Sequence, residues 1–237
     1  LDHWASVAPD RVWLAERTKE GPWRKITYAQ ARASVRRIAA SLLTRNLSVE
    51  RPLVILSGNS IDHALLGMAS MYAGIAYAPI SPAYSLISSD HSKLKYIFDL
   101  LTPGLIFAEP STPFASLLDG KDGPQVDEAN ARVGLDTIAK FLFTSGSTGM
   151  PKGVINTQKM LCSNAVMASQ HFAYLRNEPP VTLDWSPWNH TAGGNHDFNL
   201  VLHNGGTLYI DDGKPVPGAI EATVRNLRDV SPNWYFN

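Results

Sequence analysis

The chain has 237 residues, with 21 basic and 21 acidic side chains, and 44% of its residues are hydrophobic. This length and composition allow a buried core, in one large domain or in two small ones. The absence of a net charge argues against a global attraction to nucleic acid or to an anionic membrane. The one cysteine, Cys162, can form no intramolecular disulfide, so we expect a buried structural thiol and a cytoplasmic protein.

Helical and strand-like patterns alternate along the chain, which predicts an α/β fold of β-α-β units with a largely parallel sheet. Thr27 and Gln30 form a capping-box pattern at the start of the first helix, and Ser60 is the expected cap of the second. We expect residues 109–137 to be less regular and to cover the surface. The pattern predicts helices over 27–43, 60–71, 93–101, 158–173, 195–203 and 218–227, and strands over 53–56, 75–78, 105–108, 139–143, 154–156, 181–185 and 207–210.

A segment without charged residues lies between Ala64 and Ser89, and it is long enough to consider a membrane span. Gly74, Pro79 and Pro82 interrupt it, so we expect a helix, a strand and a loop instead. The N-terminus has no basic segment followed by an apolar one, so no secretory signal is visible.

Residues 144–153, Thr-Ser-Gly-Ser-Thr-Gly-Met-Pro-Lys-Gly, have the composition of a phosphate-binding loop. Glycines let backbone N–H groups converge on anionic oxygens, hydroxyl groups add donors, and the lysine adds a mobile charge. A hairpin turn or a linker is the alternative for a segment rich in glycine and serine. The candidate phosphate-binding residues are Thr144, Ser145, Gly146, Ser147, Thr148, Gly149 and Lys152.

The spacing of this loop differs from that of two better known motifs. Pro151 before the lysine and Gly153 after it exclude the G-x-x-x-x-G-K-[ST] loop. Ser145 stands where the G-x-S-x-G motif of serine hydrolases needs a glycine.

Together with Val154, this loop resembles the signature loop of the adenylate-forming enzymes: acyl- and aryl-CoA synthetases, luciferases and the adenylation domains of peptide synthetases. Residues 184–196 and 204–214 are similar to the feruloyl-CoA synthetase branch. The resemblance extends over nearly the whole chain, and it implies the N-terminal part of the large domain of that family.

The resemblance implies a ligase that uses ATP, Mg²⁺ and coenzyme A to convert a carboxylic acid, such as ferulate, into an acyl-adenylate and then a thioester. Lys152 would neutralise the leaving phosphates, Thr144 would give an oxygen to Mg²⁺, and His190 would orient the acid. Trp185 and Trp188 would contact an aromatic acid, although tryptophans more often lie in a core. His190 has the alternative of only hydrogen-bonding its neighbours.

Members of that family are much longer, and their adenine and ribose motifs and their C-terminal lid domain have no counterpart here. We therefore expect an N-terminal fragment that is inactive by itself and prone to self-association. The alternatives are a fatty-acid or amino-acid adenylating enzyme, and a non-catalytic nucleotide-binding module. The spacing of His190, His196 and His203 does not match a zinc motif, and Asp211 and Asp212 are expected in a turn.

Overall fold

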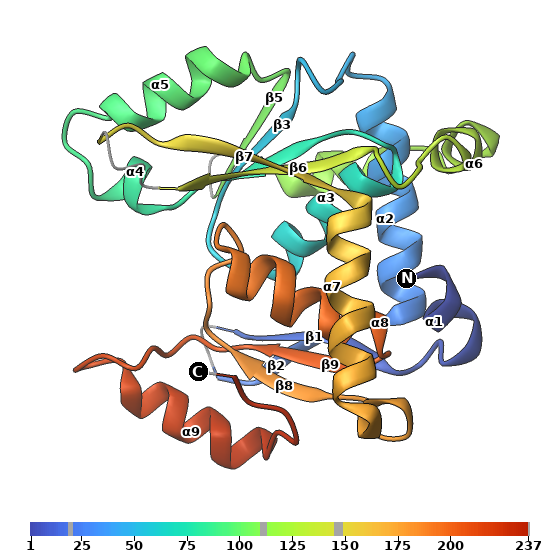
Figure 1. The fold of residues 1–237 in the computed structure, drawn as a ribbon, viewed down its shortest axis with the longest axis vertical. Helices are drawn as coiled ribbons and strands as arrows, with labels where there is room; N and C mark the ends of the chain where they lie inside the picture. The colour runs from blue at the N-terminus through green and yellow to red at the C-terminus, as the bar shows by residue number, and fades with distance from the viewer. Residues whose placement is uncertain (19–20, 110–112, 145–148, 237) are drawn as a thin grey trace. The chain divides into compact units, whose positions relative to one another are not determined.

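The structure is a computed structural model that describes residues 1–18, 21–109, 113–144 and 149–236. The chain divides into two compact units, each with one sheet among the described residues (Figure 1). The first unit contains residues 1–32, 59–61 and 161–237, and the second contains residues 33–58 and 62–160.

The first unit is built on a four-stranded sheet with the order β2-β1-β9-β8. β1, β9 and β8 run parallel, and β2 is an antiparallel edge strand. Trp13 lies fully buried in the core, where it contacts the rings of Tyr28 and Phe198. The strands are β1 (Val12–Arg17), β2 (Trp23–Thr27), β8 (Val181–Asp184) and β9 (Thr207–Ile210), and the helices are α1 (Asp2–Val7), α7 (Gln158–His171, from residue 161 in this unit), η2 (Ala173–Arg176), η3 (Ala192–Asp197), α8 (Phe198–His203) and α9 (Ile220–Val230).

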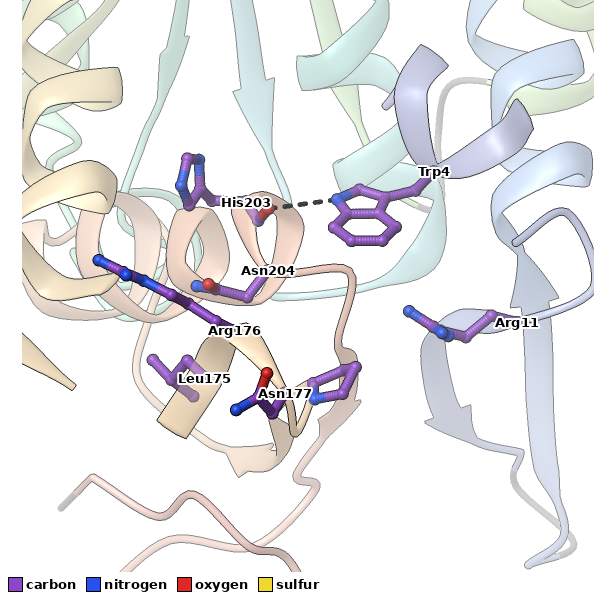
Figure 2. A pocket seen from close by; sticks show the side chains of 8 residues that line it. Trp4, Arg11, Leu175, Arg176, Asn177, His203 and Asn204 are labelled. Carbon is purple, nitrogen blue, oxygen red and sulfur yellow. Dashed lines mark hydrogen bonds between the residues drawn. The ribbon is translucent and has the colours of Figure 1, made fainter. Parts of the chain in front are cut away.

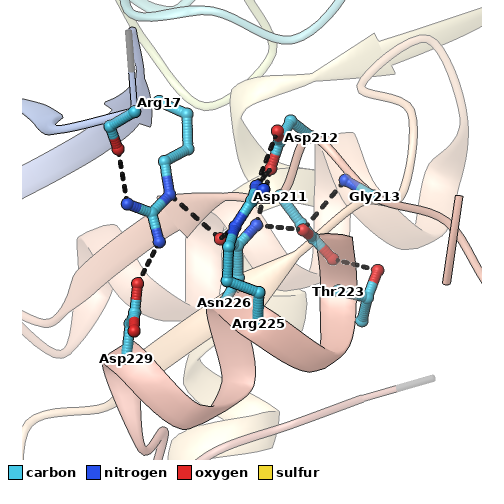
Figure 3. Close-up of polar contacts among 9 residues, drawn as sticks. Arg17, Asp211, Asp212, Gly213, Thr223, Arg225, Asn226 and Asp229 are labelled. Carbon is cyan, nitrogen blue, oxygen red and sulfur yellow. Dashed lines mark hydrogen bonds and ion pairs between the residues drawn. The ribbon is translucent and has the colours of Figure 1, made fainter. Parts of the chain in front are cut away.

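Asp211 follows β9 and connects this strand to α9, as Figure 3 shows. One carboxylate oxygen accepts the N–H of Gly213 at 3.0 Å and the amide of Asn226 at 2.7 Å, and the other accepts the hydroxyl of Thr223 at 2.7 Å. Arg225 of α9 pairs with Asp212 at 3.0 Å. The expected turn at Asp211 and Asp212 is confirmed, and its carboxylates also hold a helix against the sheet.

The second unit is built on a five-stranded sheet with the order β5-β3-β4-β6-β7. Its first four strands are parallel, and β7 pairs antiparallel with β6. The strands are β3 (Leu53–Leu56), β4 (Tyr77–Pro79), β5 (Leu105–Ala108), β6 (Ile138–Thr144) and β7 (Lys152–Thr157), and the helices are α2 (Tyr28–Leu43, from residue 33 in this unit), α3 (Ile61–Tyr72, from residue 62 in this unit), α4 (Ala83–Leu86), α5 (Ser92–Leu101), η1 (Phe114–Asp119) and α6 (Pro124–Ala131).

Two crossover helices cover this sheet from opposite sides. The chain moves one way from β3 to β4 and back across the sheet to β5, so right-handed crossovers place α3 and α5 on opposite faces. Ile97 and Leu101 of α5 pack with Val54 of β3 and Ala78 of β4 in one buried cluster. The predicted β-α-β unit is therefore confirmed.

Most predicted elements are present, with ends shifted by one to three residues. The capping box at the start of α2 is confirmed, because the backbone N–H of Thr27 donates to Gln30 Oε1 at 3.0 Å and the N–H of Gln30 donates to Thr27 Oγ1 at 3.3 Å. The predicted α/β fold with largely parallel strands is confirmed, and these strands form two sheets. In the described part of the chain, no helix is long and apolar enough to cross a membrane.

Two expectations were wrong. Residues 109–137 contain η1 and α6, which local periodicity did not reveal because α6 buries only Val126 and Ala129. Cys162 is exposed, because the buried stripe of α7 contains Leu161, Ala165 and Ser169 and leaves position 162 on the outer side. The helix predicted over 195–203 is confirmed, as the π-helix η3 followed without a break by α8.

Arg36 attaches α6 to α2. Its side chain is 9% exposed and pairs with Asp122 at 2.7 Å and Asp127 at 2.6 Å, and it donates to the hydroxyl of Tyr72 at 3.1 Å. We expect Arg36→Ala to lower the free energy of unfolding by about 1–3 kcal/mol, since two charge-assisted hydrogen bonds are lost. Chemical denaturation measures this, and Arg37→Ala on the exposed side of the same helix is the control. Equal stability of the two variants would contradict the role of Arg36.

Candidate functional site

The predicted phosphate loop connects β6 and β7, which form an antiparallel hairpin. Thr144 and Lys152 are Cα partners at the end of this ladder that adjoins the loop, and both are exposed. Opposite residues of an antiparallel pair have Cα atoms about 4.5–5.5 Å apart, so a hydroxyl and an ammonium group begin and end the loop close together.

Two further features support the loop geometry. Gly149 has a φ of 88°, a conformation that favours glycine, and nothing lies within 4 Å of the position that a Cβ would take. Pro151 is buried immediately before Lys152 and fixes the backbone there. The candidates Ser145, Gly146, Ser147 and Thr148 lie outside the described residues.

Lys140 of β6 is a buried charge four residues before Thr144, and the sequence analysis did not select it. It is 2% exposed, and its Nζ lies 5.9 Å from the centre of the Tyr77 ring. Burial lowers the pKa of Lys140 to about 7. His63 is also buried, and its pKa is lowered to about 4, first by burial and then by the charge of Lys140. The signal in the sequence was a lysine inside the apolar run that leads to the loop.

The second group of candidates lies in the first unit, in the loop that follows β8. The side chain of Asn59 holds this loop, because its Nδ2 donates to the carbonyl of Ser186 at 2.8 Å and its Oδ1 accepts the N–H of Trp188 at 3.0 Å. Sequence analysis missed Asn59, since only the tertiary structure brings it to residues 186–188.

The π-helix η3 packs on the same loop through two glycines. A Cβ on Gly193 would lie 2.3 Å from the carbonyl oxygen of Ser186, and a Cβ on Gly194 would lie 2.2 Å from that of Trp188. Both contacts are far too short for any other residue without a backbone shift. π-Helices are rare and frequently occur at functional sites.

His190, Trp185 and Trp188 are brought together on this loop, but they differ in exposure. His190 is exposed, and its Nδ1 accepts the N–H of Ala192 at 3.4 Å, which leaves Nε2 as the donor of the ring. Trp185 is half-buried. Trp188 is 4% exposed and packs edge-on against Phe198 at 5.1 Å between ring centres, so its contact with substrate stays a prediction.

Two buried carboxylates stand beside this loop. Asp184 ends β8 and accepts the N–H of Ser186 at 2.8 Å. Burial raises the pKa of Asp184 to about 6. Asp197 ends η3 and is 1% exposed, and neither of its carboxylate oxygens has a hydrogen-bond partner among the described residues. Burial, and then the charge of Asp184, raise the pKa of Asp197 to about 8.

The predicted site residues thus fall into two groups. Thr144, Gly149 and Lys152 lie on the hairpin of the second unit, and Trp185, Trp188 and His190 lie on the loop of the first. Within the described residues, no group of three or more histidine, cysteine or acidic side chains is placed to hold a metal ion.

Comparison with known proteins gives a family match over almost the entire chain. A family model described as "AMP-binding enzyme" matches residues 1–236. A probable non-canonical nonribosomal peptide synthetase, CymA of Salinispora arenicola, is 31% identical over 227 residues, which are 91% of this chain and 3% of CymA. Phosphinothricin tripeptide synthetase PhsB of Streptomyces viridochromogenes is 28% identical over 198 residues, 78% of this chain and 16% of PhsB.

Solved structures share the fold. ATP-bound MatB from Rhodopseudomonas palustris has a TM-score of 0.69 at 24% identity, and the match covers 94% of this chain and 45% of MatB. O-succinylbenzoate coenzyme A synthetase (MenE) from Bacillus subtilis, in complex with ATP and magnesium ion, has a TM-score of 0.74 at 19% identity, with 99% and 61% covered. The chain therefore spans only part of the length of these relatives.

The buried Asp197 predicts a pH-dependent stability. Because its pKa is raised from 3.8 to about 8 in the folded chain, its contribution to stability is largest below pH 4 and is lost as the pH rises to about 8. Asp197→Asn removes the charge and keeps the shape. We expect this variant to be more stable than the parent at pH 9, by at least about 1 kcal/mol, with a smaller difference at pH 5.

Thermal unfolding at the two pH values measures this difference, and exposed Asp10→Asn in the same unit is the control. A difference between Asp197→Asn and the parent that is the same at both pH values would show that the pKa of Asp197 is not raised in the folded chain.

Proposed function

Because the chain belongs to the AMP-binding enzyme family, we propose that it is part of an ATP-dependent ligase that activates a carboxylic acid as an acyl-adenylate. In this reaction a carboxylate oxygen attacks the α-phosphorus of ATP. A bond forms between that oxygen and the phosphorus, and the bond to the β-phosphate oxygen breaks, so pyrophosphate leaves. The observation that carries the proposal is the pairing of Thr144 with Lys152 at the loop end of the β6–β7 hairpin.

The described loop residues suit a polyphosphate. Lys152 is exposed and provides a cation on a flexible stem, and Thr144 provides a hydroxyl donor opposite to it. Gly149 keeps the backbone free of side-chain bulk. Lys152 would stabilise the negative charge that grows on the β- and γ-phosphates as they depart, which is electrostatic stabilisation of the transition state.

Mg²⁺ fits this loop with few protein ligands. It prefers oxygen donors and keeps several waters and phosphate oxygens in its shell, so one hydroxyl such as that of Thr144 suffices. When bound, the ion would neutralise phosphate charge. The positive charge of Lys152, opposite Thr144, would attract the phosphates and would not bind the ion.

The acid would lie at the loop that follows β8. Exposed His190 offers an Nε2–H donor, which suits a carboxylate or a ring substituent of the acid, and half-buried Trp185 offers a flat apolar surface. Asn59 and the two glycines of η3 fix the backbone that carries both side chains. These residues would position the acid, since none is a nucleophile in this reaction.

We propose a hydroxycinnamate such as ferulate as the acid and coenzyme A as the acceptor in a second step, in which the thiol sulfur bonds to the acyl carbon and AMP leaves. The support is the similarity of residues 184–196 and 204–214 to the feruloyl-CoA synthetase branch, together with Trp185. Activation of an amino acid is the second candidate, and the 31% identity to a peptide synthetase favours it.

Lys152→Ala tests the loop in the complete parent enzyme. We expect adenylation to fall at least about tenfold, a loss of about 1.4 kcal/mol or more in transition-state stabilisation. ATP–pyrophosphate exchange is the measurement. Lys159→Ala, which removes an exposed lysine seven residues later, should leave the rate unchanged. An unchanged exchange rate in Lys152→Ala would refute the role of the lysine.

A substrate panel tests the rest of the proposal. The parent enzyme is assayed for ATP–pyrophosphate exchange with ferulate, coumarate, a fatty acid and a set of amino acids. We expect ferulate or coumarate to give a kcat/KM at least about tenfold above the others. Preference for an amino acid would support the second candidate. If none of the acids supports exchange, the result would favour a non-catalytic module.

A further inference from the structure

Residues 185–197, which are the loop after β8 together with the π-helix η3, lie between two buried acids of the first unit. Asp184 ends β8 immediately before the loop and is 2% exposed, and Asp197 ends η3 and is 1% exposed. Trp185 and His190 belong to this segment. The conformation that the two acids permit therefore decides where both of these side chains lie.

Three of the four carboxylate oxygens of these acids have no hydrogen-bond partner among the described residues. Oδ1 of Asp184 accepts the N–H of Ser186 at 2.8 Å, whereas Oδ2 of Asp184 and both oxygens of Asp197 are buried without a donor. Loss of water without new hydrogen bonds costs far more for a carboxylate ion than for a neutral carboxyl group. The packed segment therefore favours the protonated form of Asp197.

The titratable groups around the two acids add no positive charge that offsets theirs. Nε2 of His196 lies 4.0 Å from Oδ1 of Asp197, and burial lowers the pKa of this histidine, which keeps it largely neutral above pH 7. After burial, the charge of Asp211 beside β9 also raises the pKa of Asp184. Tyr235 is neutral, because burial and then the charges of Asp211 and Asp184 raise its pKa.

Two arginines near the carboxyl ends of the strands already have acidic partners. Arg17 ends β1 and pairs with Asp229, and Arg225 pairs with Asp212 at 3.0 Å. Among the residues that the structure describes, no positive charge lowers the pKa of either buried acid.

Two further arginines of this unit lie around a pocket of about 310 Å³ (Figure 2). Trp4, Arg11, Arg176 and Asn204 are among its lining residues. Arg11 and Asn204 come shortly before β1 and β9, so the pocket lies at the amino ends of these strands, and the four residues of β9 separate it by about 13 Å from the carboxyl ends. Arg11 donates to the carbonyl of Gly205 at 2.9 Å, and Figure 2 shows the guanidinium of Arg176 pointing away from that of Arg11. Neither arginine is placed to neutralise the two acids.

η3 and the loop are in direct backbone contact, so neither can move without the other. A Cβ on Gly194 would lie 2.2 Å from the carbonyl oxygen of Trp188. The N–H of Gly194 also donates to the carbonyl of His190 at 2.9 Å. A movement of η3 that brings Asp197 to water therefore displaces the loop as well.

We propose that residues 185–197 form a pH-sensitive element, which is closed while Asp197 is protonated and opens when Asp197 releases its proton to water. Opening exposes the carboxylate and moves His190 and Trp185 out of their packed arrangement. It would thereby weaken binding of the acid substrate, and this consequence, unlike the opening itself, rests on the proposed function.

The pKa of Asp197 gives the direction and the range of the effect. It is raised to about 8 in the closed segment, against 3.8 for a side chain in water. The closed form is therefore favoured at low pH, and the equilibrium constant for opening rises by up to about tenfold per pH unit between the two values. Above about pH 8 it is constant, because the closed form is then ionised as well.

Hydrogen exchange of the Gly194 amide measures the opening, followed by NMR on the ¹⁵N-labelled chain. Rates at pH 6.5, 7.0 and 7.5 are divided by the intrinsic rates to give protection factors. We expect the protection factor of Gly194 to fall about tenfold over this range. It should also be lower than the protection factors of the β1–β9 ladder, whose amides exchange only on global unfolding. Asp184, with a pKa of about 6, is already largely ionised at these pH values.

Two variants and a control assign the opening to Asp197. Asp197→Asn keeps the shape of the side chain and cannot ionise, so we expect the protection factor of Gly194 to change less than about twofold over the same range. Exposed Asp10→Asn in the same unit should keep the tenfold fall. Asp184→Asn retains Oδ1 and removes the charge that raises the pKa of Asp197, so the protection factor should become constant at a lower pH.

Three results would overturn the proposal: a protection factor of Gly194 that does not change with pH, a value equal to that of the β1–β9 ladder, or the same fall in Asp197→Asn as in the parent chain. The parent chain alone gives the first two results, so they hold even if a variant does not fold. No substrate is present in these measurements, so their outcome is independent of which acid the enzyme activates.

Discussion

The antiparallel ladder between β6 and β7 is the constraint on which the proposed chemistry depends. Its register makes Thr144 and Lys152 partners, so the backbone hydrogen bonds of two strands hold a hydroxyl and an ammonium group at the two ends of one loop. β7 lies at the edge of its sheet, and its Val154 and Ile155 are exposed. The loop therefore begins at β6, an interior strand of the sheet, and ends at β7, its edge strand.

Buried charges accompany both groups of candidate residues. Lys140 precedes the hairpin loop, and Asp184 and Asp197 flank the loop that carries His190. In each case burial removes water and favours the neutral form of the group, so the pKa of the lysine is lowered and the pKa values of the two acids are raised. Such groups lower stability when they ionise, and they concentrate at functional sites because the same burial strengthens electrostatic interactions there.

The sheet of the first unit presents a different chemistry at each edge. At the carboxyl ends of its parallel strands are the acids Asp184 and Asp211 and the loop with His190 and Trp185. At the amino ends is the pocket with Arg11 and Arg176. Ligands of open α/β sheets generally bind outside the carboxyl ends of the strands, which agrees with the position proposed for the acid.

The sequence by itself determined the elements with strong local signals and the loop chemistry. The capping box of α2, the strands β3, β5 and β9, and the strands that flank the glycine- and hydroxyl-rich loop depend on residues close together in the chain, and the match to the family depends on motifs of the same kind. The tertiary structure alone decided features that need partners far apart in sequence. Arg36 with Asp122 secures a helix that has little periodicity, Asn59 fixes the loop at 186–188, and the pocket joins Trp4 to Asn204. The exposure of Cys162 and the shifted pKa values of Lys140 and Asp197 belong to this second class, because burial is set by what packs around a side chain and not by its neighbours in the chain.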